Sequence, residues 1–239
     1  MNPIISSLTL AVIGLLVYLI FKAFDKRLTL GFGFLFAVYI ALDDLATGLP
    51  SAFPALRLVE GEWNWSGKIY SLLLSVTVIL ALRIKPETAG ITFRQKNLKA
   101  SLIALGLFII WGLSLGLLFG PQPPSLETVA FQASMPGLAE EIVYRGIAPA
   151  ILLGLIWGKE QPEGIPWTVV LITAIMFGVW HGLGYSNAGF SFDAMSALFP
   201  FIGSIAGGWL RFNSGSLLFP ILVHGVANIA FHLSPFIRS

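Results

Sequence analysis

The chain has 239 residues, of which 56% are hydrophobic and 11% are charged, and its mean hydropathy is +0.84. So few charges exclude an ordinary soluble domain of this length, because its surface would carry too little polar material. A bilayer is the solvent that this composition fits. The absence of cysteine excludes disulfides, thiolate metal sites and a cysteine nucleophile. The net charge of +2, without a basic run, gives no indication of nucleic-acid binding.

Apolar stretches divide the chain into eight expected membrane-spanning helices. In chain order they are Ile4 to Ala23, Leu28 to Leu45, Ile69 to Leu82, Ser101 to Gly120, Val129 to Trp157, Thr168 to Leu183, Ala194 to Leu210 and Leu217 to Leu233. The fifth is overlong and contains Pro136, Gly137, Gly146 and Pro149, so a kink or break is expected there. The prediction is an all-α polytopic membrane protein of about eight transmembrane helices in one bundle, with residues 1–239 forming a single domain.

Lysine and arginine residues are distributed unevenly between the two alternate sets of loops, which predicts the orientation. One set carries Lys22, Lys26, Arg27, Arg83, Lys85, Arg94, Lys96, Lys99, Lys159 and Arg211. The other set carries Arg57, Lys68 and Arg238. The positive-inside rule assigns the first set to the cytoplasm, so both termini should face away from it. The basic stretch from Ile91 to Lys99 should lie on the cytoplasmic surface.

Ionisable residues inside apolar spans indicate where a functional site lies, because each is costly at mid-bilayer unless it is paired or faces water. The fifth span contains Glu140, Glu141 and Arg145. On a helix, Glu141 and Arg145 stand at i and i+4 and can pair, whereas Glu140 points about 100° away. Glu140 therefore needs a different partner.

All three histidines of the chain also lie in spans. His181 ends the sixth span, while His224, Asn228 and His232 follow one another at i+4 intervals in the eighth. These three form one polar stripe, which should face the bundle rather than lipid. Glu140, His181 and His224 are the candidates for chemistry, since unpaired titratable groups in a bilayer are costly without a use.

Other polar residues of the spans are given a structural interpretation. The Glu141–Arg145 pair is expected to be architectural, and His232 is expected to hydrogen-bond between helices. Asp43 and Asp44 are expected to meet the membrane interface near the end of the second span.

Three motifs on the late helices resemble one protein family. In chain order they are Glu140-Glu141-x-x-x-Arg145, Phe177-x-x-x-His181 and His224-x-x-x-Asn228. They are similar to the motifs of the CAAX prenyl protease type 2 and bacteriocin-processing family of intramembrane glutamate proteases. The resemblance covers about the last 110 residues, with a motif-bearing core at approximately 125–235.

The resemblance implies an intramembrane endopeptidase that works without a metal or another cofactor. Carried over by position, Glu140 and His181 activate water, and His224 and Asn228 stabilise the oxyanion. The implied partners are the bilayer and a peptide or membrane-protein substrate, which is prenylated in part of the family. In a prokaryote, such a multi-pass protein would lie in the plasma membrane.

Glu141 and Arg145 take a supporting role in the resemblance, which the helical spacing also suggests. The chemistry agrees with the residue types. Peptide hydrolysis needs a base that takes a proton from water, and a desolvated carboxylate can act as one. It also needs donors aimed at the developing oxyanion, which an Asn amide and a His N–H supply.

Three alternatives compete with this interpretation. The chain has no H-E-x-x-H motif, but two glutamates and two histidines can hold zinc with an open position. A proton-coupled transporter would use buried Glu and His residues as a proton relay. An immunity or scaffold protein would retain the same residues and act by binding a partner.

Overall fold

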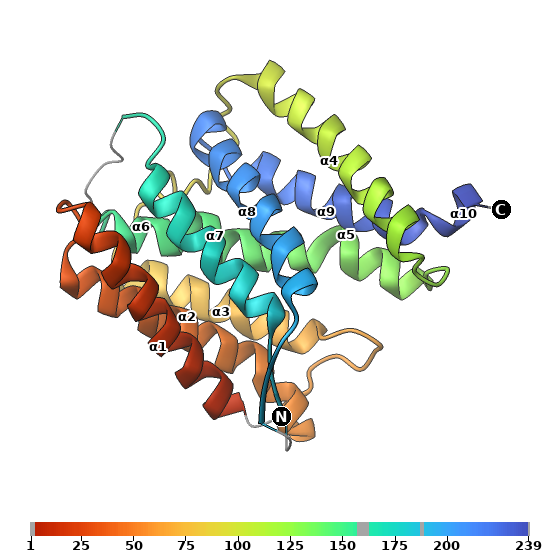
Figure 1. Cartoon of the computed structure of the whole chain (residues 1–239), viewed down its shortest axis with the longest axis horizontal. Helices are drawn as coiled ribbons and strands as arrows, with labels where there is room; N and C mark the ends of the chain where they lie inside the picture. The colour runs from red at the N-terminus through yellow and green to blue at the C-terminus, as the bar shows by residue number, and fades with distance from the viewer. Residues whose placement is uncertain (1–2, 157–162, 187–188, 239) are drawn as a thin grey trace.

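The computed structural model describes residues 3–156, 163–186 and 189–238, and shows a helical bundle with one short β-hairpin (Figure 1). The elements in chain order are α1 (Pro3–Phe24), α2 (Leu30–Ala52), the 3-10 helix η1 (Pro54–Leu56), α3 (Trp65–Ala81), α4 (Leu98–Phe119), α5 (Leu126–Glu141), the π-helix η2 (Ile142–Ile147), α6 (Ala148–Leu152), α7 (Trp167–Gly182), β1 (Leu183–Ser186), β2 (Gly189–Phe192), α8 (Ala194–Ser214), α9 (Leu218–Leu233) and α10 (Pro235–Arg238).

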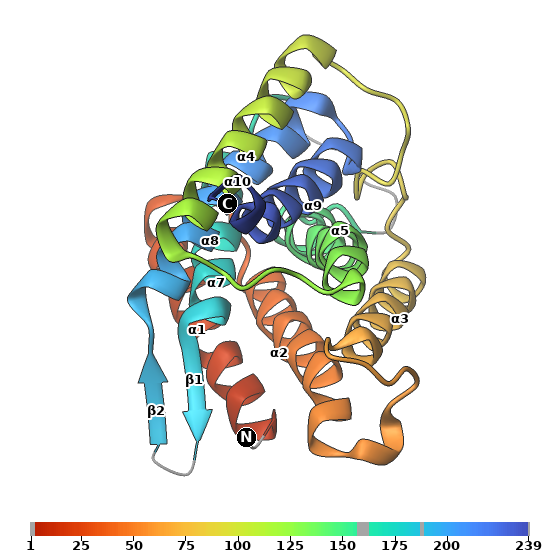
Figure 2. The ribbon, with the colours of Figure 1, turned by 90° about the vertical axis from the view of Figure 1, so that its right-hand side faces the viewer.

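The helices pack mainly against their neighbours in the chain. Helix α1 lies along α2 and α2 along α3, while α7 lies along α8. Helix α4 packs on α9, and α9 in turn packs on α5. Figure 2 shows α5 between α9 on one side and α2 and α3 on the other. The motif-bearing helices are therefore covered by helices from the first half of the chain.

Several helices present apolar side chains outward, as lipid contact requires. Helices α1, α2 and α4 are long and apolar enough to cross a membrane, and α3, α7 and α9 are shorter apolar helices. On α1, Leu8, Val12 and Leu16 lie at i+4 intervals, and each is more than half exposed. The structure therefore confirms a mainly helical membrane protein, whereas the number of eight spans stays a prediction.

The β-hairpin is absent from the all-α prediction. Strands β1 and β2 pair antiparallel directly after α7 and project from one end of the bundle (Figure 2). Asp193 then begins α8, because its carboxylate accepts hydrogen bonds from the backbone N–H groups of Met195 and Ser196. Strands of four residues are too short for alternation of apolar and polar side chains to distinguish them from a loop.

The fifth span changes its helical type instead of breaking at Pro136. Helix α5 continues through Pro136 to Glu141, and six residues of π-helix follow. In this π-helix the N–H of Ala148 bonds to the carbonyl of Val143, five residues earlier. Pro149 has no N–H to donate, which favours the altered pattern. The π-turn directly follows the two glutamates, a position common at functional sites.

The basic stretch after α3 is an irregular loop that is tied to the α8–α9 turn. Lys96 N–H donates to Ser214 O at 2.7 Å, and Leu217 N–H donates to Gly90 O at 2.8 Å. Gly90 adopts φ +82°, a conformation that favours glycine. Of the other basic residues, Lys159 lies outside the described residues.

Candidate active site

Helices α5 and α9 approach each other closely because glycine occupies both sides of their contact. A Cβ on Gly137 would lie 2.8 Å from the carbonyl oxygen of Ile221, and one on Gly225 would lie 2.8 Å from that of Ala133. Backbone therefore packs against backbone, as small residues allow between membrane helices. This close approach places the glutamates of α5 beside the polar stripe of α9.

The second glutamate bridges an arginine and a histidine. Arg145 Nε lies 3.1 Å from Glu141 Oε2, as the i,i+4 spacing predicts, with side chains only 4% and 3% exposed. Glu141 Oε1 lies 2.7 Å from His224 Nδ1. The guanidinium of Arg145 also covers the ring of Phe177 at 4.3 Å. The ion pair is confirmed, but a purely architectural interpretation is incomplete because Glu141 also holds His224.

The first glutamate has a buried counter-charge that the sequence interpretation missed. Lys68 Nζ lies 2.7 Å from Glu140 Oε1, with side chains 8% and 9% exposed. Glu140 does have a different partner, as expected, but its cation comes from α3 and not from a later span. The sequence holds a signal for this, because Asn64 is a favourable helix cap and its side chain accepts from Gly67 N–H. A helix that begins at Trp65 puts Lys68 in its first turn.

The other carboxylate oxygen of Glu140 faces two imidazole rings. Glu140 Oε2 lies 4.0 Å from His181 Nε2 and 3.8 Å from His224 Nε2. These distances exceed a direct hydrogen bond. Within the described part of the chain, this oxygen is buried without a hydrogen-bond partner.

The hydrogen bonds of the two histidines determine which ring nitrogens face the glutamate. His181 Nδ1 lies 2.7 Å from the carbonyl oxygen of Phe177. A carbonyl oxygen only accepts, so Nδ1 carries the hydrogen and Nε2 faces Glu140 with its lone pair. The ionised carboxylate of Glu141 likewise requires a hydrogen on Nδ1 of His224.

Asn228 completes the candidate group, and His232 lies apart from it. The Nδ2 of Asn228 donates to Gln132 Oε1 at 2.9 Å, which fixes the orientation of the amide. The ring of His232 packs edge-on against Trp63, with ring centroids 6.0 Å apart. His232 does not line the cavity that contains the other polar groups, and its structural role stays a prediction.

Asp43 and Asp44 lie inside the bundle, so their expected place at the interface is wrong. Helix α2 continues about two turns beyond them. Asp43 is buried and accepts from the hydroxyl of Ser71 at 2.5 Å. Asp44 accepts from Ser7 Oγ at 2.8 Å and from Trp180 Nε1 at 2.9 Å. These aspartates form a hydrogen-bonded layer behind the site.

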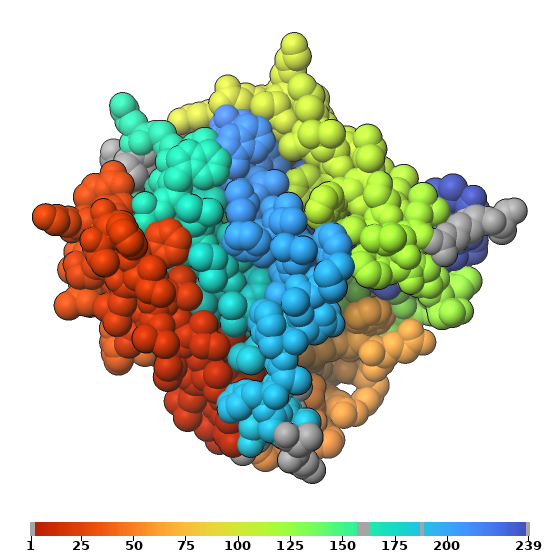
Figure 3. Space-filling view, in the orientation of Figure 1, coloured from red at the N-terminus to blue at the C-terminus, as the bar shows by residue number. Residues whose placement is uncertain are grey.

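A cavity of about 680 Å³ joins the candidate residues. Its polar wall consists of Thr47, Asn64, Lys68, Gln132, Glu140, Glu141, Arg145, His181, His224 and Asn228. The rest of the wall is mainly apolar and aromatic, and includes Trp63, Phe108, Trp111, Phe131, Phe177, Trp180, Phe199 and Phe231. In Figure 3 the surface is hollowed where α8, α4 and the segment around the α2–α3 connection meet. Such a chamber can hold an apolar peptide beside charged groups.

The spacing of the imidazole and carboxylate groups can be compared with the demands of zinc. Tetrahedral bonds of about 2.0–2.2 Å would place ligand atoms roughly 3.3–3.6 Å apart. The observed separations of 3.8 and 4.0 Å are wider. Among the residues that the structure describes, no group of three or more His, Cys, Asp or Glu side chains is arranged to hold a metal ion.

Comparison with known families gives one match. Residues 122–230 match the family model described as Type II CAAX prenyl endopeptidase Rce1-like. This segment contains all the motif residues of α5, α7 and α9, whereas Lys68 precedes it. Searches of curated proteins and of solved structures found no match. Over residues 122–230, this membrane protein is similar to the Rce1-like type II CAAX prenyl endopeptidases.

Proposed function

We propose that this chain is an intramembrane endopeptidase in which Glu140 and His181 activate a water molecule. The observation that carries the proposal is the buried Oε2 of Glu140, which faces His181 Nε2 at 4.0 Å. A gap of this length fits one oxygen atom at hydrogen-bond distance from both groups. His181 Nε2 accepts a hydrogen bond from one O–H of that water, and Glu140 Oε2 accepts a hydrogen bond from the other.

The reaction then follows a simple proton balance. The water oxygen attacks the peptide carbonyl carbon while Glu140 or His181 takes one proton from it. A tetrahedral intermediate with an oxyanion forms. Its collapse breaks the C–N bond, and the stored proton passes to the leaving amine. One water is consumed, and a carboxyl group and an amine are released.

His224 and Asn228 supply the donors for the oxyanion. Nδ1–H of His224 binds Glu141, which leaves Nε2 facing the cavity, where it can donate to the oxyanion when it also carries a hydrogen. The charges of Lys68 and Arg145 balance those of Glu140 and Glu141. An amide has two N–H groups, so Asn228 can bind Gln132 with one and the oxyanion with the other.

Hydrolysis by this site is expected to be independent of metal. Lys68 already neutralises Glu140, and its ammonium disfavours a second cation at the same carboxylate. Treatment of purified protein with phenanthroline should leave peptide cleavage unchanged, and elemental analysis should find no stoichiometric zinc. About one equivalent of zinc, with activity lost on its removal and restored by its return, would support the zinc alternative instead.

Lys68 is proposed as the residue that positions Glu140 and keeps it charged. In Lys68→Met, Glu140 loses its counter-charge and takes up a proton more readily, so cleavage at neutral pH should fall at least about tenfold. The acidic limb of the kcat/KM profile should move to higher pH, because a higher pH is needed to ionise the base. Lys68→Arg should restore most activity.

A purely structural role for Lys68 makes different predictions. Lys68→Met would then lower the yield or melting temperature while the surviving protein keeps the wild-type pH profile. An unchanged profile with full specific activity per folded molecule would remove Lys68 from the mechanism.

A further inference from the structure

We infer that Trp180 and Asp44 are positioning residues of the site. The indole of Trp180, held by Asp44, keeps the ammonium of Lys68 on one particular oxygen of Glu140. This role in catalysis rests on the proposed function of Glu140. Trp180 occupies an unspecified position of the motif Phe177-x-x-x-His181, and Asp44 lies outside the matched residues 122–230.

The ammonium of Lys68 lies between a carboxylate and an aromatic ring. Its Nζ is 2.7 Å from Glu140 Oε1 and 4.9 Å from the centroid of the Trp180 ring. Lysine carries a point charge on a flexible stem, so the carboxylate alone does not decide which of its two oxygens the charge binds. The negative face of an indole adds a second attraction with a fixed direction. Trp180 thereby holds the ammonium on Oε1.

The choice of oxygen matters because Oε2 of Glu140 is the atom that faces the histidines. Oε2 lies 4.0 Å from His181 Nε2, which is the gap that fits the attacking water. An ammonium on Oε2 would fill this gap with a donor and deprive the water of its acceptor. By keeping Lys68 on Oε1, the indole leaves Oε2 for the water.

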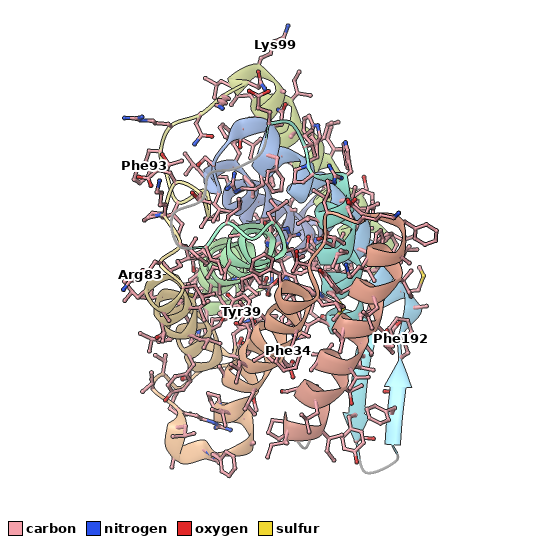
Figure 4. The ribbon with its side chains drawn as sticks, turned by 90° about the vertical axis from the view of Figure 1, so that its left-hand side faces the viewer. Phe34, Tyr39, Arg83, Phe93, Lys99 and Phe192 are labelled. Atoms are coloured by element: carbon pink, nitrogen blue, oxygen red, sulfur yellow. The ribbon has the colours of Figure 1, made fainter. Side chains whose placement is uncertain are left out.

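The orientation of the indole is set by the hydrogen-bonded layer behind the site. Trp180 Nε1 donates to Asp44 Oδ1 at 2.9 Å, and Ser7 Oγ donates to Asp44 Oδ2 at 2.8 Å. Figure 4 looks onto the two helices that carry Ser7 and Asp44, α1 and α2, with α7 behind them. Because donors from two helices hold this carboxylate, it anchors the N–H edge of the ring.

The same indole also contacts the other side of the water gap. Its ring stands at 86° to the ring of His181, with centroids 4.8 Å apart. Nδ1 of His181 is fixed in turn by the carbonyl oxygen of Phe177 at 2.7 Å. One ring therefore bears on His181 directly and on Glu140 through Lys68. A change at Asp44 is expected to reach this pair through the ring.

A double-mutant cycle between Trp180 and Lys68 tests whether the ring acts through the ammonium. Trp180→Leu should lower kcat about five- to tenfold, the loss expected for one partly desolvated cation–π contact, with KM nearly unchanged. In the Lys68→Met background the same substitution should change kcat by less than about twofold, because the cation is already absent. A ring that only fills space or binds substrate would give the same loss in both backgrounds, or a change in KM.

Trp209→Leu is the matched control for the loss of an indole. Trp209 is also half-buried, but it packs against the apolar cluster of Ala104, Leu210, Phe219 and Val223 and does not line the cavity. This variant should leave kcat unchanged in both backgrounds. An equal loss from Trp209→Leu and Trp180→Leu would remove the special role of Trp180.

Asp44 is tested through the acceptor that it provides. Asp44→Asn keeps an oxygen for the indole N–H and should retain most activity, whereas Asp44→Ala removes the acceptor and should lower kcat about threefold. In the Trp180→Phe background, which has no indole N–H, Asp44→Ala should cause no further loss. The same loss in both backgrounds would show that Asp44 does not act through the ring.

Peptide cleavage and melting temperature are measured on the same preparations, with Glu140→Gln as the inactive reference. If Trp180→Leu does not fold, Trp180→Phe takes its place in the cycle, with an expected loss of about threefold beside Lys68 and none in the Lys68→Met background.

The outcomes separate this inference from the proposed function. Equal losses from the Trp180 variant in both backgrounds, or no loss in either, would overturn the inference while cleavage above the Glu140→Gln level upholds the protease. Equal cleavage by wild type and Glu140→Gln would instead reject the proposed function, and the positioning role with it.

Discussion

Glu140→Gln is expected to lower kcat by about 10²- to 10⁴-fold, because it removes the group that takes a proton from water. Glutamine keeps an oxygen for Lys68 and matches glutamate in shape. This retained hydrogen bond and the unchanged volume should keep the protein folded. Cleavage of a fluorogenic peptide and the melting temperature in detergent are measured on the same preparation. The double variant Glu140→Gln/Lys68→Met has no uncompensated charge and should be folded and inactive.

Glu141→Gln provides the contrast within the same helix turn. Arginine cannot be deprotonated, so loss of Glu141 leaves Arg145 buried without its ion pair. Stability should fall by about 3–5 kcal/mol, which a lower melting temperature would report. Activity should fall as well, because the charge-assisted hydrogen bond from Nδ1–H of His224 to the Glu141 carboxylate, which orients the ring, is lost. An active Glu140→Gln beside a well-folded, inactive Glu141→Gln would reverse the two assignments.

The second large loss of activity is expected when either proposed oxyanion donor, His224 or Asn228, is removed. His224→Ala and Asn228→Ala should each lower kcat by about 10²- to 10³-fold, the usual loss for one such donor, with little change in KM. His232→Ala is the matched control on the same helix, because its ring packs on Trp63 outside the cavity. It should keep nearly full activity. A severe loss from His232→Ala at unchanged melting temperature would show that the donor on this stripe was misassigned.

The parts of the site that depend on local spacing could be predicted from the sequence. The Glu141–Arg145 contact follows from the 3.6-residue period of a helix. The same period places His224 and Asn228 on one face, and both line the cavity. Their polar side chains turn inward because lipid offers no hydrogen bonds.

Features that depend on contacts far along the chain could not be predicted. Lys68 reaches Glu140 across 72 positions of sequence, and no local period connects them. Asp43 stands near the end of the second expected span, which predicts a place at the interface, yet the helix continues to Ala52 and Ser71 binds the carboxylate. In the π-turn after Glu141 the backbone hydrogen bonds span five residues instead of four. This change hardly alters the spacing of apolar and polar side chains, so the sequence pattern does not reveal it.

The most direct test of a glutamate-dependent intramembrane protease is a comparison of peptide termini in membranes from cells that express wild type or Glu140→Gln at equal levels. Quantitative mass spectrometry of new N- and C-termini provides the measurement. The mechanism predicts a set of cleavage products that is present with wild type and absent with Glu140→Gln. Identical termini in both membranes, with the wild-type protein folded and abundant, would contradict it.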